Sequence, residues 1–351
     1  MPPSVLLPHL LLALPLALVS ALVVRAMIAR PILDHPDHRK AHARPTPKGG
    51  GLGPVAAFLL GMLALFQLAP LTPLAEPRFI GVVLAAAAIA AVALADDVWN
   101  FRFVVKLGAQ AVAALVALGS GLVLEQLSLP GLGEVPLGVL GVGLTMFWIV
   151  GCTNAVNFMD GMDGLVAGVV VIACVALAAV AASEAGWFVF AAALFLGAGF
   201  AGFLPFNLHP ARIFMGDVGS QFAGFLLAVL AVAAANFEKS QVSFLVVPLL
   251  LFGLLWDAAF TLARRAWAGE AVAAPHRAHL YQMAQRSGLP VRLVAGLHWG
   301  FALLGAALCW AFLRLAPAEK PLVVLPALAV QLAWTLYVAR RMRRAGLDWK
   351  G

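Results

Sequence analysis

Charged side chains are scarce in this chain: Asp, Glu, Lys and Arg together make up 11% of its 351 residues, whereas hydrophobic residues make up 63%. Soluble domains are close to half apolar and about a quarter charged, so this balance excludes a soluble globular protein. The apolar residues are gathered in runs of about 20, the length that spans a bilayer core. Because lipid offers the backbone no hydrogen-bond partners, we expect these runs to be helices.

Cysteine is also rare. Cys152, Cys174 and Cys309 are the three in the chain, and each falls within or at the end of an apolar run. An odd number at such positions gives neither a disulfide framework nor the paired spacing of a zinc site. We expect all three to be packing residues.

Basic residues are missing before the first apolar run, and Arg25 and Arg30 stand at its far end instead. This order is unlike that of a cleavable secretory signal, which begins with a basic region. We therefore expect an N-terminus outside the cytoplasm and a first loop inside it.

The hydropathy pattern predicts an all-α, polytopic membrane protein with about 11 spans, in which residues 1–351 form a single catalytic domain with a cytoplasmic C-terminus. The spans are expected at about 4–27, 52–71, 79–95, 104–124, 137–153, 165–182, 187–205, 219–236, 242–262, 291–313 and 321–339.

Lys and Arg are distributed unevenly between the alternate loops. Four of the 23 fall on the outside (Arg78, Lys239, Arg314 and Lys320), and the other 19 fall on the inside or in the C-terminal tail. Cytoplasmic loops of membrane proteins carry such an excess of positive charge. The net charge of +7 is therefore explained by membrane topology, and we expect no nucleic-acid partner.

The residues able to support chemistry lie in the inside loops, at about 28–51, 96–106, 154–164, 206–219 and 264–291. The outside loops are short, Pro- and Gly-rich connectors. A transporter or lipid flippase, which is the main alternative, would more often place polar residues at the middle of its spans. The pattern favours a catalytic site at the cytoplasmic membrane surface.

The stretch from Asn154 to Gly164 reads NAVNFMDGMDG and lies between two long apolar runs. Its carboxylates, Asp160 and Asp163, and its amides, Asn154 and Asn157, come with no cation. Uncompensated acids beside a bilayer are costly, and a metal ion would remove that cost. The alternative is that the two Asp-Gly pairs are simply turn signals.

Acids recur in two other inside loops. Asp96 and Asp97 stand at the C-terminal end of an apolar run, where the helix dipole disfavours them. Asp217 stands between glycines just before another apolar run, and an ordinary N-cap is its alternative reading. Lys48 precedes Gly49, Gly50 and Gly51, a sequence typical of backbone that approaches phosphate closely.

Lys106 is a further phosphate or carboxylate partner, with ordinary snorkelling to the membrane surface as its alternative. Carboxylates without a Cys/His set suit Mg²⁺ or Mn²⁺. A metal combined with Lys, Arg and His residues is the equipment of phosphoryl chemistry. From these residues we infer a metal-dependent phosphotransferase acting between a soluble phosphate compound and a membrane lipid.

Several motifs in this order resemble those of the polyprenyl-phosphate N-acetylhexosamine-1-phosphate transferases, the family that includes the phospho-MurNAc-pentapeptide translocase. The motifs are Arg44-Pro-Thr-Pro-Lys-Gly-Gly-Gly51, Asp96-Asp97, Asn154–Leu165, Asn207 with Phe214–Ser220, and Arg277-Ala-His279. The resemblance implies transfer of a HexNAc 1-phosphate from a UDP-sugar to undecaprenyl phosphate in a bacterial inner membrane, with release of UMP. It also implies a homodimer.

The resemblance carries roles onto individual positions. Asp217 matches a metal-binding Asp, and Asp96 and Asp97 match paired acids, of which the first is a proposed base. Catalytic roles therefore fall on Asp96, Asp97, Asp217 and His279, and metal ligation on Asp217, Asp160 and Asp97. Substrate binding falls on Lys48, Lys106, Asn154, Asn157, Asp160, Asp163, Asn207, Phe214 and Arg277, with Phe214 near the uridine.

The last motif departs from the translocase. The translocase has three histidines in a row there, whereas this chain has His276, His279 and then Tyr281-Gln282. This form is more similar to the branch that initiates O-antigen or capsule chains, and it leaves the donor sugar open. A CDP-alcohol phosphotransferase is another membrane Mg²⁺ enzyme, but the Arg of its Asp-Gly-x-x-Ala-Arg motif is missing after Asp163.

Overall fold

The computed structural model describes residues 1–34, 45–67, 77–129, 133–236, 242–272, 274, 276–316 and 319–349. Thirteen α-helices occupy the described part of the chain, together with two short β-hairpins and a 3₁₀ turn. The all-α class is therefore confirmed. His35, His38, His42 and Arg44 of the first inside loop lie outside the described residues.

Eight helices are long and apolar enough to cross a membrane, among the residues that were searched. They are α1 (Pro3–Ala29), α3 (Pro77–Trp99), α5 (Val139–Met159), α6 (Leu165–Ser183), α7 (Trp187–Asn207), α8 (Asp217–Asn236), α12 (Val291–Arg314) and α13 (Val324–Arg344), the last preceded by the 3₁₀ turn Lys320–Val323. Two more apolar helices, α2 (Leu52–Gln67) and α4 (Phe103–Gly119), are shorter.

The span expected at 242–262 is not one straight helix. The chain forms α9 (Val246–Leu250), breaks at Leu251 and continues as α10 (Phe252–Trp267). Another short helix, α11 (Leu280–Arg286), follows in the last inside loop. The single straight span expected at 242–262 is therefore wrong, because apolar composition alone does not show where a helix breaks. The expected total of about 11 spans stays a prediction.

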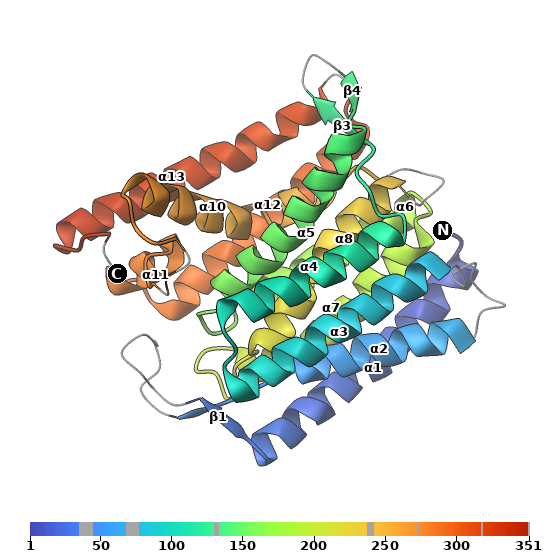
Figure 1. Cartoon of the computed structure of the whole chain (residues 1–351), viewed down its shortest axis with the longest axis horizontal. Helices are drawn as coiled ribbons and strands as arrows, with labels where there is room; N and C mark the ends of the chain where they lie inside the picture. The colour runs from blue at the N-terminus through green and yellow to red at the C-terminus, as the bar shows by residue number, and fades with distance from the viewer. Residues whose placement is uncertain are drawn as a thin grey trace.

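Helix α8 occupies the centre of the molecule. Side chains along its whole apolar length are buried, from Val218 to Ala234. It packs against α3 and α5, while α7 joins α6 to α1 and α2. Figure 1 shows α1–α4 on one side of this core and α10–α13 on the other. Because α8 begins at Asp217, the most buried of the eight long helices carries a carboxylate at one end of the bundle.

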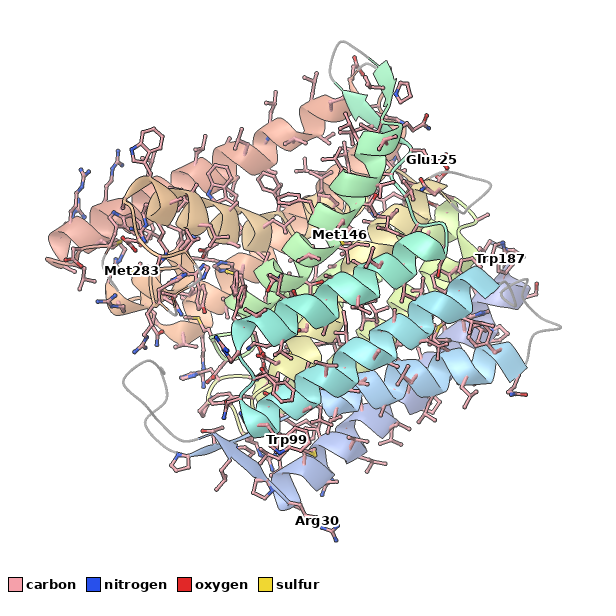
Figure 2. The ribbon with its side chains drawn as sticks, in the orientation of Figure 1. Arg30, Trp99, Glu125, Met146, Trp187 and Met283 are labelled. Atoms are coloured by element: carbon pink, nitrogen blue, oxygen red, sulfur yellow. The ribbon has the colours of Figure 1, made fainter. Side chains whose placement is uncertain are left out.

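The ends of the helices that were predicted to be cytoplasmic gather at one end of the molecule. Figure 2 shows Arg30, Trp99 and Met283 toward that end and Glu125 and Trp187 toward the other. The hairpin of β1 (Ile32–Asp34) and β2 (Thr46–Lys48) lies at the first end. The hairpin of β3 (Gln126–Leu129) and β4 (Gly133–Pro136) lies at the opposite one. The predicted loops thus share a face.

Candidate active site

A cavity of about 700 Å³ opens at this end of the bundle, a size typical of small-molecule sites. Its walls come from β2, the ends of α3, α5 and α7, the starts of α4 and α8, and α11. The lining side chains include Lys48, Asp96, Asp97, Lys106, Asn157, Asp160, Asp163, Asn207, His209, Phe214, Asp217, Arg277, Gln282, Gln285 and Arg286.

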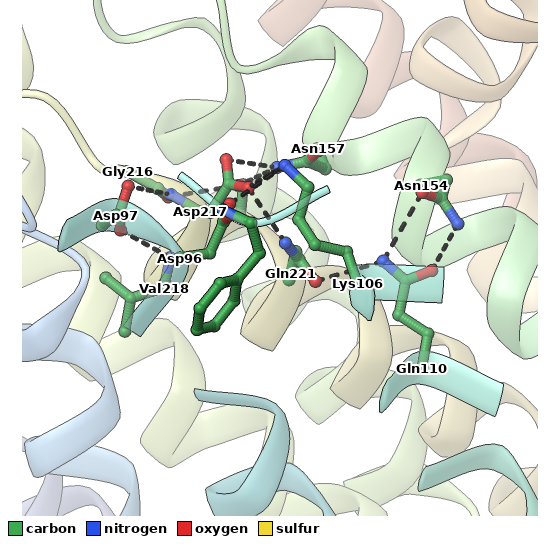
Figure 3. Close-up of polar contacts among 12 residues, drawn as sticks. Asp96, Asp97, Lys106, Gln110, Asn154, Asn157, Gly216, Asp217, Val218 and Gln221 are labelled. Atoms are coloured by element: carbon green, nitrogen blue, oxygen red, sulfur yellow. Dashed lines mark hydrogen bonds and ion pairs between the residues drawn. The ribbon is translucent and has the colours of Figure 1, made fainter. Parts of the chain in front are cut away.

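Asp217 is the point at which three helices meet in this cavity. Its Oδ2 accepts hydrogen bonds from Lys106 Nζ of α4 and from Gln221 Nε2 of α8, both at 3.1 Å. Its Oδ1 accepts one from Asn157 Nδ2 of α5, also at 3.1 Å (Figure 3). Charge-assisted hydrogen bonds of this kind are about twice as strong as neutral ones. The carboxylate is therefore held in one orientation from three sides.

Asp97 caps helix α8 from a neighbouring helix. Its Oδ1 accepts the backbone N–H of Asp217 at 3.2 Å, and its Oδ2 accepts that of Val218 at 3.1 Å (Figure 3). The first N–H groups of a helix lack partners within it, and a carboxylate there also interacts favourably with the helix dipole. Lys48 Nζ lies 3.9 Å from the Oδ1 of Asp97. Asp97 thus fixes the start of α8, and with it Asp217.

Asp96 and Asp97 belong to the last turn of α3, which continues to Trp99, rather than to a loop. The Oδ1 of Asp96 accepts the backbone N–H of Phe101 at 2.6 Å, and its Oδ2 lies 3.0 Å from Lys106 Nζ. Lys106 therefore bridges Asp96 and Asp217. The charge of Asp96 at the end of α3 is offset by this ammonium group, and that of Asp97 by the start of α8 and Lys48. The snorkelling alternative is wrong, because the ammonium group faces the carboxylates.

The boundary expected for the NAVNFMDGMDG loop is also wrong. Helix α5 continues to Met159, so Asn154 and Asn157 are helical and the loop proper begins at Asp160. Burial, together with the negative charges of Asp217, Asp97 and Asp163, raises the pKa of Asp160 well above its ordinary value. A cation bound beside Asp160 would lower this pKa again, because an opposite charge favours the ionised carboxylate. A raised pKa in the absence of a cation is therefore expected of an acid in a cation site.

Asp163 and Asn207 hold the neighbouring loops together. The Oδ2 of Asp163 accepts the backbone N–H of Ala211 at 3.0 Å and lies 2.7 Å from His209 Nδ1. Asn207 accepts the N–H of Gly164 and donates to the carbonyl of Ile213, both at 3.0 Å. Both residues line the cavity, and their side chains fix the shape of its wall.

Gly50 and Gly51, two of the three glycines after Lys48, donate their N–H groups to backbone carbonyls rather than to the cavity. Gly50 donates to the carbonyl of Phe214 and Gly51 to that of Met215, both at 2.9 Å. A Cβ on Gly51 would lie 2.3 Å from the Cα of Gly219. The glycines therefore allow two backbones to pack together, which brings Lys48 beside Phe214 in the cavity wall.

His279 is placed differently from the other predicted residues. Its side chain is 4% exposed, and its Nδ1 lies 3.1 Å from Asp257 Oδ1 of α10. Asp257 also accepts the backbone N–H groups of Leu280 at 2.9 Å and Tyr281 at 3.0 Å. His279 is not among the lining side chains, whereas Arg277 and Gln282 on either side of it are. Asp257 therefore anchors the segment that carries them.

His276 lies against the same anchor, with its ring centroid 4.9 Å from that of His279. Desolvation and the positive charges of His279, Arg265 and Arg264 lower the pKa of His276 to about 4. The imidazole is therefore uncharged at neutral pH. In the segment from His276 to Arg286, the positively charged side chains that line the cavity are Arg277 and Arg286.

Comparison with known proteins identifies the family of the chain that forms this cavity. A model of "Glycosyl transferase family 4" matches residues 79–235, the segment from α3 to α8. A probable undecaprenyl-phosphate N-acetylglucosaminyl 1-phosphate transferase of Bacillus subtilis is 30% identical over 281 residues, which cover 79% of this chain and 76% of that protein. This chain belongs to glycosyl transferase family 4.

Two further relatives of this family-4 chain agree. A decaprenyl-phosphate N-acetylglucosaminephosphotransferase of Mycobacterium leprae is 31% identical over 304 residues, covering 78% of this chain and 75% of that protein. A phospho-N-acetylmuramoyl-pentapeptide-transferase of Enterococcus faecalis is 44% identical over a shorter stretch of 108 residues, 31% of this chain and 34% of that protein. The resemblance inferred from the motifs is confirmed, and it favours a transferase over a transporter, a flippase or a CDP-alcohol phosphotransferase.

Most of the residues predicted for the site meet in the family-4 cavity. Eleven of them line it; His279 and Asn154 do not. Sequence reasoning missed Gln221, Gln110 and Asp257, which hold predicted residues in place, and Gln282, Gln285 and Arg286, which line the wall. A polar side chain inside an otherwise apolar run was the available signal for Gln110 and Asp257, because such residues are costly in a membrane.

The donor set of the cavity fits a hard divalent cation. Asp217, Asp160 and Asp97, the three predicted ligands, all line it and offer carboxylate oxygens. Among the residues that were searched, no three His, Cys, Asp or Glu side chains are grouped closely enough to hold a metal ion by themselves. Mg²⁺ commonly takes one or two carboxylates and completes its shell with water and substrate phosphates, and this arrangement suits that mode.

Replacing Asp257 with Asn is expected to weaken the anchor of α11. An amide offers one acceptor oxygen where the carboxylate offers two, so the N–H of Leu280 or Tyr281 is left unpaired at a cost of about 1–3 kcal/mol. We expect a lower melting temperature in detergent and lower activity, because Arg277 and Gln282 lose their fixed position. Glu319→Gln, in the exposed loop before the 3₁₀ turn, is the matched control. Unchanged melting and activity in Asp257→Asn would refute the anchor.

Proposed function

We propose that this family-4 enzyme transfers a HexNAc 1-phosphate from a UDP-sugar to undecaprenyl phosphate at the inner face of a bacterial cytoplasmic membrane. The products are a lipid-linked sugar diphosphate, which starts a cell-surface polysaccharide, and UMP. One observation carries the proposal: five carboxylates and four Lys or Arg side chains line a single cavity at the end of a bundle of membrane helices. That combination suits two phosphate substrates, one of them a lipid.

The reaction is an in-line displacement at the β-phosphorus of the donor. An oxygen of the lipid phosphate forms the new bond, and the bond between the β-phosphorus and the oxygen that bridges it to the α-phosphate breaks. The electron pair of that bond leaves with UMP. Because the second pKa of a phosphate monoester is near 6, the attacking oxygen is already ionised at neutral pH. Asp96 is thus needed less as a base than as the partner that holds Lys106.

Other side chains of the cavity would bind the phosphates, the uracil and the metal ion. Lys48, Lys106 and Arg277 supply positive charge for phosphate oxygens that gain charge in the transition state. Phe214 offers an aromatic face to the uracil. One or two of the predicted ligands Asp217, Asp160 and Asp97 would hold Mg²⁺ or Mn²⁺, which would supply positive charge to the diphosphate when bound.

The names of the relatives narrow the choice of donor sugar. Those from Bacillus subtilis and Mycobacterium leprae are both N-acetylglucosamine phosphate transferases, which makes UDP-GlcNAc the first donor to test. The segment His276-Arg-Ala-His279-Leu-Tyr281-Gln282 supports a role in O-antigen or capsule initiation rather than in peptidoglycan synthesis.

Purified enzyme with undecaprenyl phosphate, Mg²⁺ and a panel of UDP-HexNAc donors tests the proposal. We expect one donor to give a lipid product whose mass equals undecaprenyl diphosphate-HexNAc, together with an equal amount of UMP, and we expect EDTA to stop the reaction. A chain in which Asp217 is replaced by Asn is the negative control. Failure of every donor to give such a lipid would refute the proposed reaction.

A further inference from the structure

Three side-chain amides form a layer beneath the active site. They are Gln110 of α4, Asn154 of α5 and Gln221 of α8 (Figure 3). Gln110 and Gln221 are buried, with 2% and 4% of their surfaces exposed. None of the three lines the cavity, and the proposed reaction gives none of them a chemical task. Buried polar groups inside membrane helices are costly and need an explanation.

Each amide lies about one helical turn below a residue of the site, on the same helix. Gln110 follows Lys106 by four positions, Asn154 precedes Asn157 by three, and Gln221 follows Asp217 by four. Residues three or four apart share one face of a helix. Of the upper residues, Lys106 and Asn157 both donate to the carboxylate of the third, Asp217. Of the lower residues, Asn154 and Gln221 both contact the third, Gln110. The site is thus built as two stacked polar layers on the same three helices.

Gln110 and Asn154 are hydrogen-bonded to each other in both directions, and from Gln110 the hydrogen bonds lead through Gln221 to Asp217 (Figure 3). Asn154 Nδ2 donates to Gln110 Oε1 at 2.6 Å, and Gln110 Nε2 donates to Gln221 Oε1 at 3.1 Å. Gln221 Nε2 then donates to Asp217 Oδ2 at 3.1 Å. Each amide accepts with its oxygen and donates with its nitrogen, so successive bonds polarise one another. The chain ends with an N–H group directed at the one carboxylate on which the site converges.

The amides achieve this without adding charge. A Lys or Arg in the same place would be a second buried cation beside Lys106, and an Asp or Glu would repel Asp217. Amides stabilise the negative charge of Asp217 while their own transfer into the membrane costs far less than that of an ion. They also link α4, α5 and α8, so the position of Lys106 and that of Asp217 depend on each other.

We propose that Gln110, Asn154 and Gln221 are positioning residues, forming an amide relay that fixes the carboxylate of Asp217 and the ammonium of Lys106 for the transfer reaction. The expected effect of these residues on kcat rests on the proposed function. The orientation of Asp217 by Gln221 is a property of the protein without substrate. It also gives Asn154, predicted to bind substrate, an indirect role.

Gln221→Met tests the relay, because Met has a similar length and cannot donate to Asp217. We expect kcat to fall about tenfold, as one hydrogen bond to a charged group is lost, while the KM for the UDP-sugar stays within about twofold because no substrate contact is removed. Gln110→Met should give a similar loss, and the double variant should lose no more than the worse single variant. The matched control is Gln331→Met, a buried glutamine on α13, which should keep wild-type kinetics.

A second measurement does not depend on turnover. In infrared difference spectra of the purified protein, the carboxylate band that disappears in Asp217→Asn should shift in Gln221→Met and stay in place in Gln331→Met. An unmoved band, or a kcat equal to that of the wild type, would overturn the relay. A loss of kcat accompanied by an equal rise in KM and a lower melting temperature would also overturn it, by showing a merely structural role. If the band shifts in Gln221→Met but the wild-type protein transfers no sugar phosphate, the relay is supported and the proposed reaction is refuted.

Discussion

Asp217→Asn is expected to lower the rate of sugar phosphate transfer by about a thousandfold, the scale seen when one preorganised electrostatic group is removed from an active site. Asp217 accepts hydrogen bonds from Lys106, Asn157 and Gln221. In the Asn variant an amide nitrogen takes the place of one carboxylate oxygen and faces at least one of these donors. The variant also lacks the negative charge that a metal ion would need. Transfer of labelled HexNAc phosphate to lipid, followed over several hours, measures the residual rate.

The comparison variant is Glu184→Gln, which neutralises a carboxylate at the C-terminal end of α6. It should transfer sugar phosphate at the wild-type rate. Asp217→Asn must also elute as the wild type does in size-exclusion chromatography, so that the loss reflects chemistry rather than folding. A well-folded Asp217→Asn protein with more than a tenth of wild-type activity would show that the Asp217 carboxylate is not essential for transfer.

Lys106→Met is expected to lower transfer by about a hundredfold. The ammonium group lies 3.0 Å from Asp96 Oδ2 and 3.1 Å from Asp217 Oδ2. Its removal leaves two partly buried carboxylates without the cation between them, and like charges that share a site disfavour each other's ionised form. The variant should therefore lose activity through both phosphate binding and the electrostatics of the carboxylates. Steady-state kinetics with each substrate varied in turn measures the effect.

Lys320→Met is the matched control, because Lys320 lies over the ring of Phe312 and outside the cavity lining. It should leave the kinetics unchanged. Lys106→Arg keeps the positive charge and should recover part of the lost activity. Equal, small losses in Lys106→Met and Lys320→Met would show that Lys106 only satisfies charge at the membrane surface.

Hydropathy predicted most of the helices, and most of the site residues predicted from local motifs do line the cavity. The helix predictions succeed because a bilayer imposes length and composition on each helix separately. Positive charge in alternate loops placed the motifs on one face, so Asp97, Asp160 and Asp217 could be grouped before any contact was known. The boundary errors arise where competing local signals overlap. Asn154 and Asn157 stand close to two Asp-Gly pairs, which are turn signals, yet α5 continues through both amides.

Contacts between distant parts of the chain could not be predicted in this way. Gln110 and Gln221 are 111 positions apart, and Asp257 of α10 meets His279 at the start of α11, 22 positions further on. Each of these polar residues looks isolated along an apolar run, and its partner is set by how the helices pack. The same limit applies to the glycines after Lys48. Their freedom to approach another backbone was evident, but whether that backbone was protein or phosphate was decided by the fold.

The fate of the β-phosphate of the donor tests the central claim most directly. Purified enzyme is incubated with undecaprenyl phosphate, Mg²⁺ and UDP-GlcNAc labelled with ³²P at the β-phosphorus, and the lipid and nucleotide products are separated. Attack at the β-phosphorus predicts that all transferred label enters the lipid product and that the released nucleotide is unlabelled UMP. Labelled UDP, released together with a lipid that carries the sugar but no label, would contradict the account by showing that the sugar alone is transferred.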